Sequence, residues 1–397
     1  MSPLYTAILL RHDVLGHHPH ETKPQVTSLL VRHVEEALRE QGVAFTGIRS
    51  VSSYVVVETR GLEDAARVVG RVFGVVTVSY VAITPASMNE VLSLGLAVAR
   101  ERLTEGCAFS VVAEGIGTPD FRSQEISEKL TEFILESLPE LELRVDHSSP
   151  QRTISFEILD DQVYFLGDTF KGIGGLPTGS ESKVVCTISS GLDSPVASYK
   201  VMKRGCVPIF VHFDNTPFSD ESNKELAIRQ AKRLAEYVHG SEVKMYIVPH
   251  GDDLVEVLKH GPRKLTCVLC RRNMYRLAQE IALREGADAI VTGEIIGEQA
   301  SQTTQNLRAE RDAICEIPIL RPCIGDDKVE IEALARAIGT YEFASEAVSC
   351  CTLPPKYPTV RARPEDVQEA EKKMDMDWIS AEVSQAEVII LKDGPKQ

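Results

Sequence analysis

The chain has 397 residues, which is enough for two or three domains with ordinary hydrophobic cores. Hydrophobic residues make up 43% and charged residues 25%, as in soluble globular proteins, and no stretch is long and apolar enough to span a membrane. The net charge of −15 disfavours an extensive nucleic-acid-binding surface but leaves room for a local basic patch.

The cysteine content indicates the kind of cellular compartment in which the protein works. Nine cysteines occur in a long chain that begins without a signal-peptide pattern. This combination predicts a reducing, cytoplasmic environment with no membrane association. It also favours metal or sulfur chemistry at some of the cysteines over a disulfide scaffold.

The first 175 or so residues predict an α+β fold. Helices are expected near residues 26–41 and 88–105, and strands at 54–58, 76–81, 109–113, 153–158 and 163–165. Residues 176–182, which are rich in Gly, Pro and Ser, are predicted to link this region to the next.

The remainder alternates apolar strands with amphipathic helices. Strands are expected at 184–188, 207–211, 245–248 and 289–292, with helices at 195–204, after 222, at 271–285 and around 331–338. Beyond Pro364 a helix and a last strand are expected. This order is typical of an α/β fold with a doubly wound parallel sheet, in which ligands bind at the carboxyl ends of the strands.

One such strand end carries a phosphate-binding pattern. Ser189-Ser190-Gly191-Leu192-Asp193-Ser194 follows the first of these strands and opens the next helix. Unpaired backbone N–H groups, the helix dipole and the serine hydroxyls together favour an anion here. The sequence lacks the Gly-Lys-Ser/Thr ending of a Walker A loop. It resembles the SGGxDS loop of ATP pyrophosphatases, with Ser190 in place of a glycine, which is compatible with phosphate binding if the φ angle of Ser190 is negative.

A second group of motifs involves cysteine. Cys267 and Cys270 have the spacing of metal ligands, and Cys350-Cys351 lies farther along the chain. The CxxC pair alone is compatible with zinc, an iron–sulfur cluster or redox chemistry. Three thiolates suit a [4Fe–4S] cluster with one open iron.

Taken together, these segments resemble the tRNA 4-thiouridine synthetases of the ThiI type, in the short form without a rhodanese domain. The motifs that carry the resemblance run through about half the chain: Gly174-Gly175-Leu176-Pro177, Asp193-Ser194-Pro195, Cys267-Val268-Leu269-Cys270, Thr292-Gly293-Glu294, Ser301-Gln302-Thr303, Asp327-Lys328-Val329 and Cys350-Cys351-Thr352.

The resemblance implies three domains. They are a ferredoxin-like domain over residues 1–75, a THUMP RNA-binding domain over 76–175, and a PP-loop catalytic domain of the adenine nucleotide alpha hydrolase type over 176–397. It implies an enzyme that adenylates uridine 8 of tRNA with ATP and Mg²⁺ and replaces the activated oxygen with sulfur. Sulfide or another donor would supply the sulfur, and a homodimer is expected.

The resemblance also assigns roles to residues. Ser189, Ser190, Gly191, Leu192, Asp193 and Ser194 would bind ATP together with His212, Phe213, Gly293 and Gln302. Asp193 would help to place Mg²⁺ and the α-phosphate, and Lys328 would stabilise charge on the transferred group. Cys267, Cys270 and Cys351 would hold the cluster, with Cys350 as an alternative to Cys351. Alternatively, Cys267 and Cys351 would form a disulfide, as members with a rhodanese domain use their cysteines.

Three other functions fit parts of the pattern. A related PP-loop enzyme thiolating another tRNA base would usually lack the THUMP-like region and space its CxxC pairs differently. An ATP-dependent amidotransferase or ligase acting on a small metabolite would not need Cys267, Cys270 and Cys351. A catalytically silent RNA-binding protein would be expected if Ser190 blocked the phosphate loop.

Overall fold

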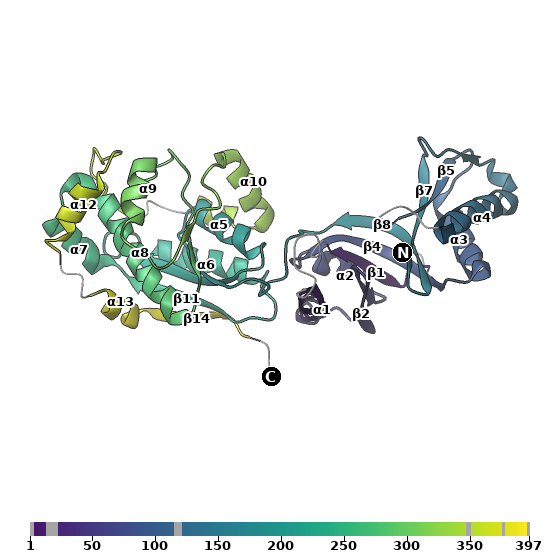
Figure 1. The fold of residues 1–397 in the computed structure, drawn as a ribbon, viewed down its shortest axis with the longest axis horizontal. Coiled ribbons are helices and arrows are strands. Elements are labelled where there is room, and N and C mark those ends of the chain that lie inside the picture. Colours follow the sequence, from purple (N-terminus) through teal and green to yellow (C-terminus); the bar gives the residue numbers. More distant parts are fainter. Residues whose placement is uncertain (1–3, 13–22, 115–120, 347–350, 375–377, 395–397) are drawn as a thin grey trace. The chain divides into compact units, whose positions relative to one another are not determined.

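A computed structural model describes residues 4–12, 23–114, 121–346, 351–374 and 378–394. The chain divides into two compact units, Met1–Gly175 and Leu176–Gln397 (Figure 1). No helix among these described residues is long and apolar enough to cross a membrane. The further division of the first unit at residues 75 and 76 stays a prediction.

The first unit is built on an eight-stranded sheet with the strand order β2-β3-β1-β4-β8-β7-β5-β6. Its strands are β1 (Ala7–His12), β2 (Gly47–Val51), β3 (Tyr54–Glu58), β4 (Val75–Pro85), β5 (Ala108–Ala113), β6 (Arg144–Val145), β7 (Arg152–Leu159) and β8 (Gln162–Lys171), and its helices are α1 (Lys23–Glu40), α2 (Leu62–Val69), α3 (Met88–Arg102) and α4 (Phe121–Ser137), with a 3₁₀ turn at Pro139–Leu141. Strands and helices therefore mix along this unit, as the α+β prediction requires.

Two hydrophobic clusters hold this sheet to its helices. The first joins α1 and α2 to β1, β3 and the start of β4 through residues such as Leu30, Val69 and Val57. The second joins α3 and α4 to β5, β7 and β8 through residues such as Leu130 and Phe165. Burial of these apolar helix faces supplies most of the driving force for this arrangement.

The second unit contains a six-stranded sheet with the order β13-β12-β9-β10-β11-β14. Its strands are β9 (Lys183–Thr187), β10 (Val207–Asp214), β11 (Val243–Pro249), β12 (Ala289–Val291), β13 (Ile319–Leu320) and β14 (Glu387–Lys392), and its helices are α5 (Asp193–Met202), α6 (Ser222–Ala235), α7 (Gly251–His260), α8 (Thr266–Glu285), α9 (Thr304–Arg311), α10 (Lys328–Ile338), α11 (Tyr341–Ser345), α12 (Pro364–Glu371) and α13 (Ile379–Gln385), with a 3₁₀ turn at Arg263–Leu265. Five strands are parallel, and β14 pairs antiparallel with β11 at one edge.

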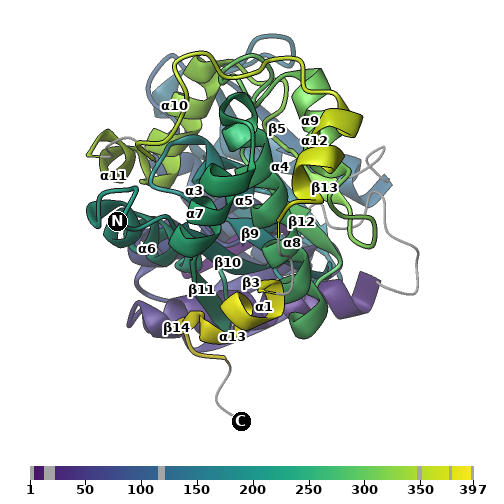
Figure 2. The same cartoon turned by 90° about the vertical axis from the view of Figure 1, so that its left-hand side faces the viewer.

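Helices cover both faces of this sheet (Figure 2). On one face α8 packs on strand residues such as Val185, Ile209 and Ile290, and α5 and α6 pack against β9 and β10 from the other side. The central strands β9, β10 and β12 are thus buried on both faces, which explains why they are mostly apolar rather than alternating. Parallel pairing brings the carboxyl ends of β9, β10 and β12 to the same edge, where ligands bind in such folds.

The structure differs from two of the sequence-based expectations. Residues 176–182 are not a free linker, because Leu176 pairs with Arg204 in a β-bridge and Thr178 is only 1% exposed. The helix predicted to begin at Arg271 begins at Thr266, so that Cys267 and Cys270 lie in its first two turns.

Candidate functional site

The segment 189–194 forms a compact turn that its own serines close. The backbone N–H of Ser189 donates to Ser194 Oγ at 2.9 Å, and the N–H of Gly191 donates to Ser189 Oγ at 3.2 Å. The hydroxyls of Ser189 and Ser194 lie 3.0 Å apart. Because the turn ends on the first residues of α5, it has the strand–turn–helix geometry of an anion-binding loop.

Ser190 is accommodated in this turn without strain. It is not among the non-glycine residues with positive φ. Its side chain is buried, and Oγ donates to Asn223 Oδ1 on α6 at 2.6 Å. The φ angle of Ser190 is therefore compatible with phosphate binding, as the sequence analysis required. Ser190 gives no reason to expect a blocked phosphate loop.

Two residues of α6 that the sequence analysis missed hold the loop in place. Besides Asn223, Gln230 donates through Nε2 to the carbonyl oxygens of Ser189 at 3.2 Å and Gly191 at 3.1 Å. Both are buried polar residues on a helix whose inward face is otherwise apolar. A polar residue on an otherwise apolar helix face is the signal that could have identified them, because a buried polar group needs a hydrogen-bond partner.

The loop opens onto a cavity of about 470 Å³, a volume in the range of small-molecule sites. Most of the predicted nucleotide-binding residues line it: Ser189, Ser190, Gly191, Asp193, Ser194, His212, Phe213, Gly293 and Gln302. Leu192 belongs to the loop but is not among the lining residues. The cavity also includes Arg271, Met274 and Tyr275 of α8, which the sequence analysis did not anticipate.

Gly293 fits directly against the phosphate loop. A Cβ atom at this position would lie 2.7 Å from the backbone nitrogen of Ser194 and 2.8 Å from the carbonyl carbon of Asp193. Real Cβ atoms do not approach backbone so closely, so only glycine lets the end of β12 pack on the start of α5.

Lys328 joins the loop from another part of the chain. It is the first residue of α10, whose N-terminus is closed by a capping box between Asp327 and Glu330. Its Nζ lies 2.8 Å from Asp193 Oδ1 and 2.6 Å from Glu298 Oε1. Glu298 was not predicted, because its position beside Lys328 depends on a turn that no local pattern marks.

Burial and ion pairing shift the pKa values of this group. Burial raises the pKa of Asp193, although the neighbouring Lys328 ammonium opposes the shift. Burial lowers the pKa of Lys328, but its hydrogen bonds to Asp193 and Glu298 outweigh this and raise it overall. The lysine is thus a firmly protonated cation at the edge of the phosphate loop.

Beneath the cavity lies a network centred on Glu294, which is 1% exposed. Glu294 Oε1 accepts a hydrogen bond from Tyr275 Oη at 2.7 Å, Oε2 lies 3.1 Å from Arg321 Nε, and Arg271 pairs with the same carboxylate. Arg271 Nε also lies 3.2 Å from Oε2 of Glu310, whose pKa burial raises to about 7. Both carboxylate oxygens of Glu294 are thus paired, and this buried network fixes the floor of the site.

His212 enters the cavity as a neutral side chain. Its Nδ1 lies 3.0 Å from the carbonyl oxygen of Ile188, to which it donates, and burial lowers its pKa. Phe213 follows it at the end of β10 and presents its ring to the same cavity.

The cysteines lie beside this cavity rather than in it. Burial raises the pKa of Cys270 well above its usual value, and the negative charges of Asp253, Cys351 and Cys267 add to the shift. The three thiols are therefore close enough to interact electrostatically. The backbone N–H of Leu353 donates to Cys351 Sγ at 3.2 Å, and no disulfide joins Cys267, Cys270 and Cys351 to one another.

This cysteine group fits a metal only in part. Among the described residues, no three His, Cys, Asp or Glu side chains are placed to hold a metal ion. Cys350, the alternative to Cys351, lies outside the described residues.

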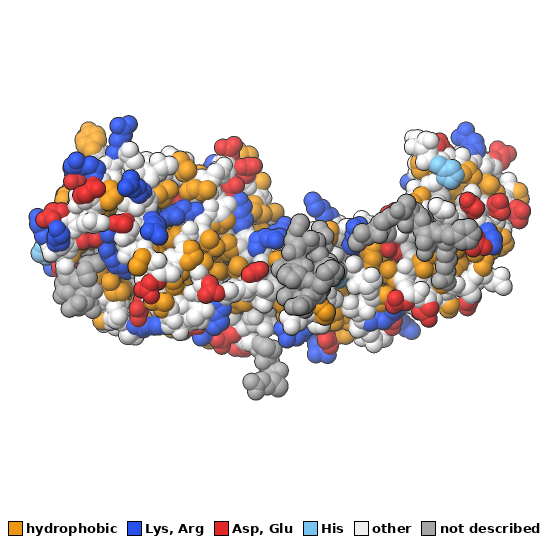
Figure 3. Space-filling model, in the orientation of Figure 1, with side chains coloured by type: hydrophobic (Ala, Val, Ile, Leu, Met, Phe, Trp, Pro, Cys, Tyr) orange, Lys and Arg blue, Asp and Glu red, His pale blue; other side chains and the backbone are white. Residues whose placement is uncertain are grey.

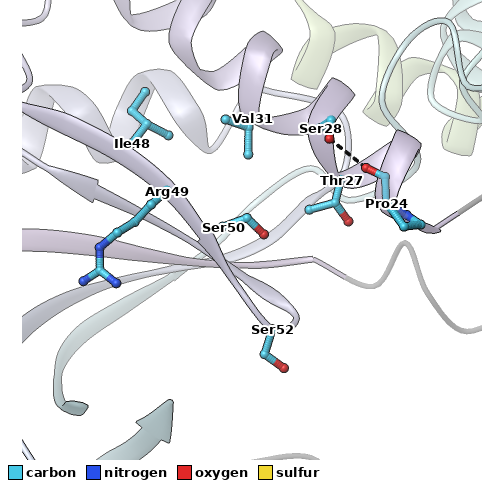
Figure 4. A pocket seen from close by; sticks show the side chains of 8 residues that line it. All are labelled: Pro24, Thr27, Ser28, Val31, Ile48, Arg49, Ser50 and Ser52. Carbon is cyan, nitrogen blue, oxygen red and sulfur yellow. Dashed lines mark hydrogen bonds between the residues drawn. The ribbon is translucent and has the colours of Figure 1, made fainter. Parts of the chain in front are cut away.

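A second cavity, of about 560 Å³, lies in the first unit between α1 and β2 (Figure 4). Hydroxyl and apolar side chains line most of it, and Arg49, its one charged lining residue, already donates to Gln162 and Tyr164. Ionisable side chains do not converge in this cavity of the first unit. The cavity of the second unit is therefore the better candidate for an active site.

Comparisons with known proteins agree with this location. Residues 179–376 match the family model described as "Thiamine biosynthesis protein (ThiI)", and residues 85–167 match the THUMP domain. A probable tRNA sulfurtransferase of Methanothermobacter thermautotrophicus is 41% identical over 281 residues, 71% of each chain. Another, of Methanocaldococcus jannaschii, is 32% identical over 382 residues and covers 93% of this chain and 97% of its own.

A solved structure is similar over almost the whole chain. It is a 4-thiouridine synthetase–RNA complex with bound ATP, with a TM-score of 0.81 and 27% sequence identity. The match covers 98% of this chain and 100% of that one.

Proposed function

The chain belongs to the ThiI family of tRNA sulfurtransferases, and from this we propose that it uses ATP to adenylate uridine 8 of tRNA and exchanges the activated oxygen for sulfur, giving 4-thiouridine. The observation that carries the proposal is that the phosphate loop and Asp193 line one cavity and that Lys328 contacts Asp193 at its edge. The similar solved structure, a 4-thiouridine synthetase–RNA complex with bound ATP, supports ATP and RNA as the proposed substrates.

In the proposed first step the uridine O4 attacks the α-phosphorus of ATP. The O4–P bond forms, the bond to the bridging oxygen breaks, pyrophosphate leaves, and the proton on uridine N3 is released to solvent as the C4=N3 bond forms. Backbone N–H groups and hydroxyls of residues 189–194 would hold the phosphates, and Asp193 would place Mg²⁺ beside them. The Lys328 ammonium would offset the charge that develops on the transferred phosphoryl group.

In the second step a sulfur nucleophile adds to C4 of the uridine and AMP leaves with the former O4. Cys267, Cys270 and Cys351, with Cys350 as the alternative, would hold a [4Fe–4S] cluster, which would supply a binding site for the incoming sulfur. The described thiols by themselves form no complete metal-holding group. The physiological donor would be sulfide or another sulfur compound.

The first unit would bind tRNA through its THUMP region. On the face shown in Figure 3, Lys and Arg side chains recur among Asp and Glu side chains, so local contacts rather than a uniformly basic surface would hold the RNA. We also propose the subdivision into ferredoxin-like, THUMP and PP-loop domains, and a homodimer.

The test is a reconstituted reaction. The purified full chain is incubated without oxygen with unmodified tRNA, ATP, Mg²⁺ and sulfide, and the tRNA nucleosides are analysed by mass spectrometry. We expect ATP-dependent 4-thiouridine and no other thiolated nucleoside. Thiolation of a different base, or thiolation that proceeds without ATP, would contradict the proposal.

A further inference from the structure

The chain between Cys351 and α12 is a positively charged surface segment that the proposed adenylation does not use. Residues 351–363 contain Lys356, Arg361 and Arg363 but no Asp or Glu, in a chain whose net charge is −15. Figure 2 shows this segment in yellow, passing from the side of the view that holds α10 to α12. Its charge is opposite to that of the chain as a whole, so it would attract an anionic partner.

The beginning of the segment is bonded to a loop of the nucleotide cavity. The backbone N–H of Thr352 donates to the carbonyl oxygen of Phe218 at 2.9 Å, and the Thr352 hydroxyl donates to the same oxygen at 3.1 Å. Ser219, the next residue after Phe218, lines the cavity. The segment therefore starts at the rim of the nucleotide site.

Asn306 fastens the end of the segment to a second loop of the cavity. This side chain is fully buried on α9, and its Nδ2 donates to the carbonyl oxygens of Ala300 at 2.7 Å and Thr359 at 2.8 Å. Its Oδ1 accepts the backbone N–H of Ala362 at 2.8 Å. Ala300 lies two residues before Gln302, which lines the cavity. Both ends of the segment are thus tied to loops that form the nucleotide site.

Between these two attachments the segment presents an aromatic ring to solvent. Tyr357 is 78% exposed, more than any other large hydrophobic side chain among the described residues. Pro354, Pro355 and Pro358 flank it and restrict the backbone, so little conformational entropy is lost when the ring binds a partner. Lys356 Nζ lies 5.5 Å from the centroid of this ring. An exposed ring beside a cation is the combination that binds unpaired nucleotides, through base stacking and phosphate contacts.

The cations around this ring are not neutralised within the chain. Five exposed cations form no ion pair with a carboxylate among the described residues, namely Lys264, Arg308, Arg311, Lys356 and Arg361. The carbonyl oxygen of Lys264 accepts the N–H of Thr359 at 3.0 Å, and the two arginines of α9 lie on the face of that helix away from the buried Asn306. Such cations are available to phosphate groups, whose neutralisation releases counterions and favours binding.

We propose that residues 351–363 and the cations beside them bind the RNA substrate next to the uridine that is to be modified. Tyr357 stacks on an unpaired base, while Lys356 and Arg361 contact phosphates on either side of it. This surface rests on the proposed tRNA thiolation, and it adds a contact on the second unit to that of the THUMP region. Because the segment begins at Cys351 and borders the nucleotide cavity, RNA held here lies beside both halves of the proposed reaction.

The test measures binding of unmodified tRNA to the full chain, without ATP or a sulfur donor, by filter binding at several salt concentrations. We expect Tyr357→Ala to weaken binding by about tenfold without changing the salt dependence, and Tyr357→Phe to bind within twofold of the unaltered protein. Lys356→Gln should reduce the slope of log affinity against log salt by roughly one. Lys232→Gln is the matched control, because Lys232 is an exposed lysine on α6 without an ion pair among the described residues, and it should change neither quantity.

An affinity of Tyr357→Ala within twofold of the unaltered protein would overturn this surface, as would an equal loss in Tyr357→Phe, which keeps the ring. Since Tyr357 is mostly exposed, its removal should leave the thermal unfolding midpoint unchanged. The assay involves no chemistry, so a loss of binding in Tyr357→Ala together with absent 4-thiouridine in the reconstituted reaction would reject the proposed function and leave the RNA surface standing. Unaffected binding together with normal thiolation would reject the surface and leave the proposed function standing.

Discussion

Lys328 Nζ lies 2.8 Å from Asp193 Oδ1, although the two residues are 135 positions apart in the chain. One opens α10 and the other opens α5, so the contact joins two helix N-termini at the edge of one cavity. A second carboxylate, Glu298, contacts the same ammonium. This arrangement keeps a cation beside the phosphate loop, and the first prediction follows from it.

Replacing Lys328 with methionine should slow adenylation by a factor of about 10² or more while the protein stays folded. Removing one group that stabilises developing charge typically lowers kcat by a factor of about 10² to 10³. Pyrophosphate release in the presence of tRNA measures the step. Lys244→Met is the matched control, because Lys244 also contacts two carboxylates, those of Glu285 and Glu242, outside the cavity. Equal losses in both variants would mean that Lys328 has no special role.

Replacing Gly293 with alanine should displace the start of α5 and weaken ATP binding by roughly tenfold or more, since the new Cβ would meet backbone atoms that cannot move independently. Titration calorimetry with a non-hydrolysable ATP analogue measures the affinity. Gly325→Ala is the control, because a Cβ there has no heavy atom within 4 Å. If Gly293→Ala bound the analogue normally, the contact between β12 and the phosphate loop would not matter for binding.

Replacing Cys351 with alanine should separate the two half-reactions. Thiolation should fall below detection, whereas tRNA-dependent pyrophosphate release should persist, because Cys351 lies outside the nucleotide cavity. Cys315→Ala, at an exposed cysteine, should retain both activities. If thiolation were lost in Cys350→Ala and kept in Cys351→Ala, the residue needed for sulfur transfer would be Cys350, and the prediction for Cys351 would be wrong.

Glu382 should make the protein less stable as the pH rises. Its Oε2 is buried without a hydrogen-bond partner among the described residues, and burial, with Asp252 adding to the effect, raises its pKa to about 7. Between the ordinary glutamate pKa near 4.5 and about 7, the folded state holds this proton more tightly than the unfolded state. The free energy of unfolding should therefore fall across that window, by roughly 3 kcal/mol at most.

Urea unfolding at pH 5 and pH 8 measures this effect. Glu382→Gln should flatten the pH dependence and be more stable than the unaltered protein at pH 8. Glu365→Gln, at an exposed glutamate with no such burial, should keep the original slope. An unchanged slope in Glu382→Gln would show that this carboxyl is solvated in solution.

The periodicity of the sequence predicted the parallel sheet and its helices because strands buried on both faces are continuously apolar. The same reasoning placed the phosphate loop, His212 and Gly293 at strand ends that meet at one edge. It could not place the start of α8, since Leu265 precedes that helix and no side chain caps it. Without that boundary, Arg271 could not be assigned to the nucleotide cavity.

Residues that contact partners far away in the sequence also could not be predicted from the sequence. Glu298 and Gln230 carry no local motif, and each contributes through a contact that only the folded chain creates. Polar residues on otherwise apolar helix faces were the available hint, and a single sequence does not say which partners they meet.

Transfer of AMP to tRNA tests the central proposal most directly. ATP labelled at its α-phosphate is incubated with the full chain and tRNA without a sulfur donor, and the label in the tRNA is measured. We expect label in tRNA that has uridine at position 8, none when cytidine replaces it, and labelling slower by a factor of about 10² or more with Lys328→Met. Label that appears equally in both tRNAs, or ATP cleaved only to ADP and phosphate, would contradict it.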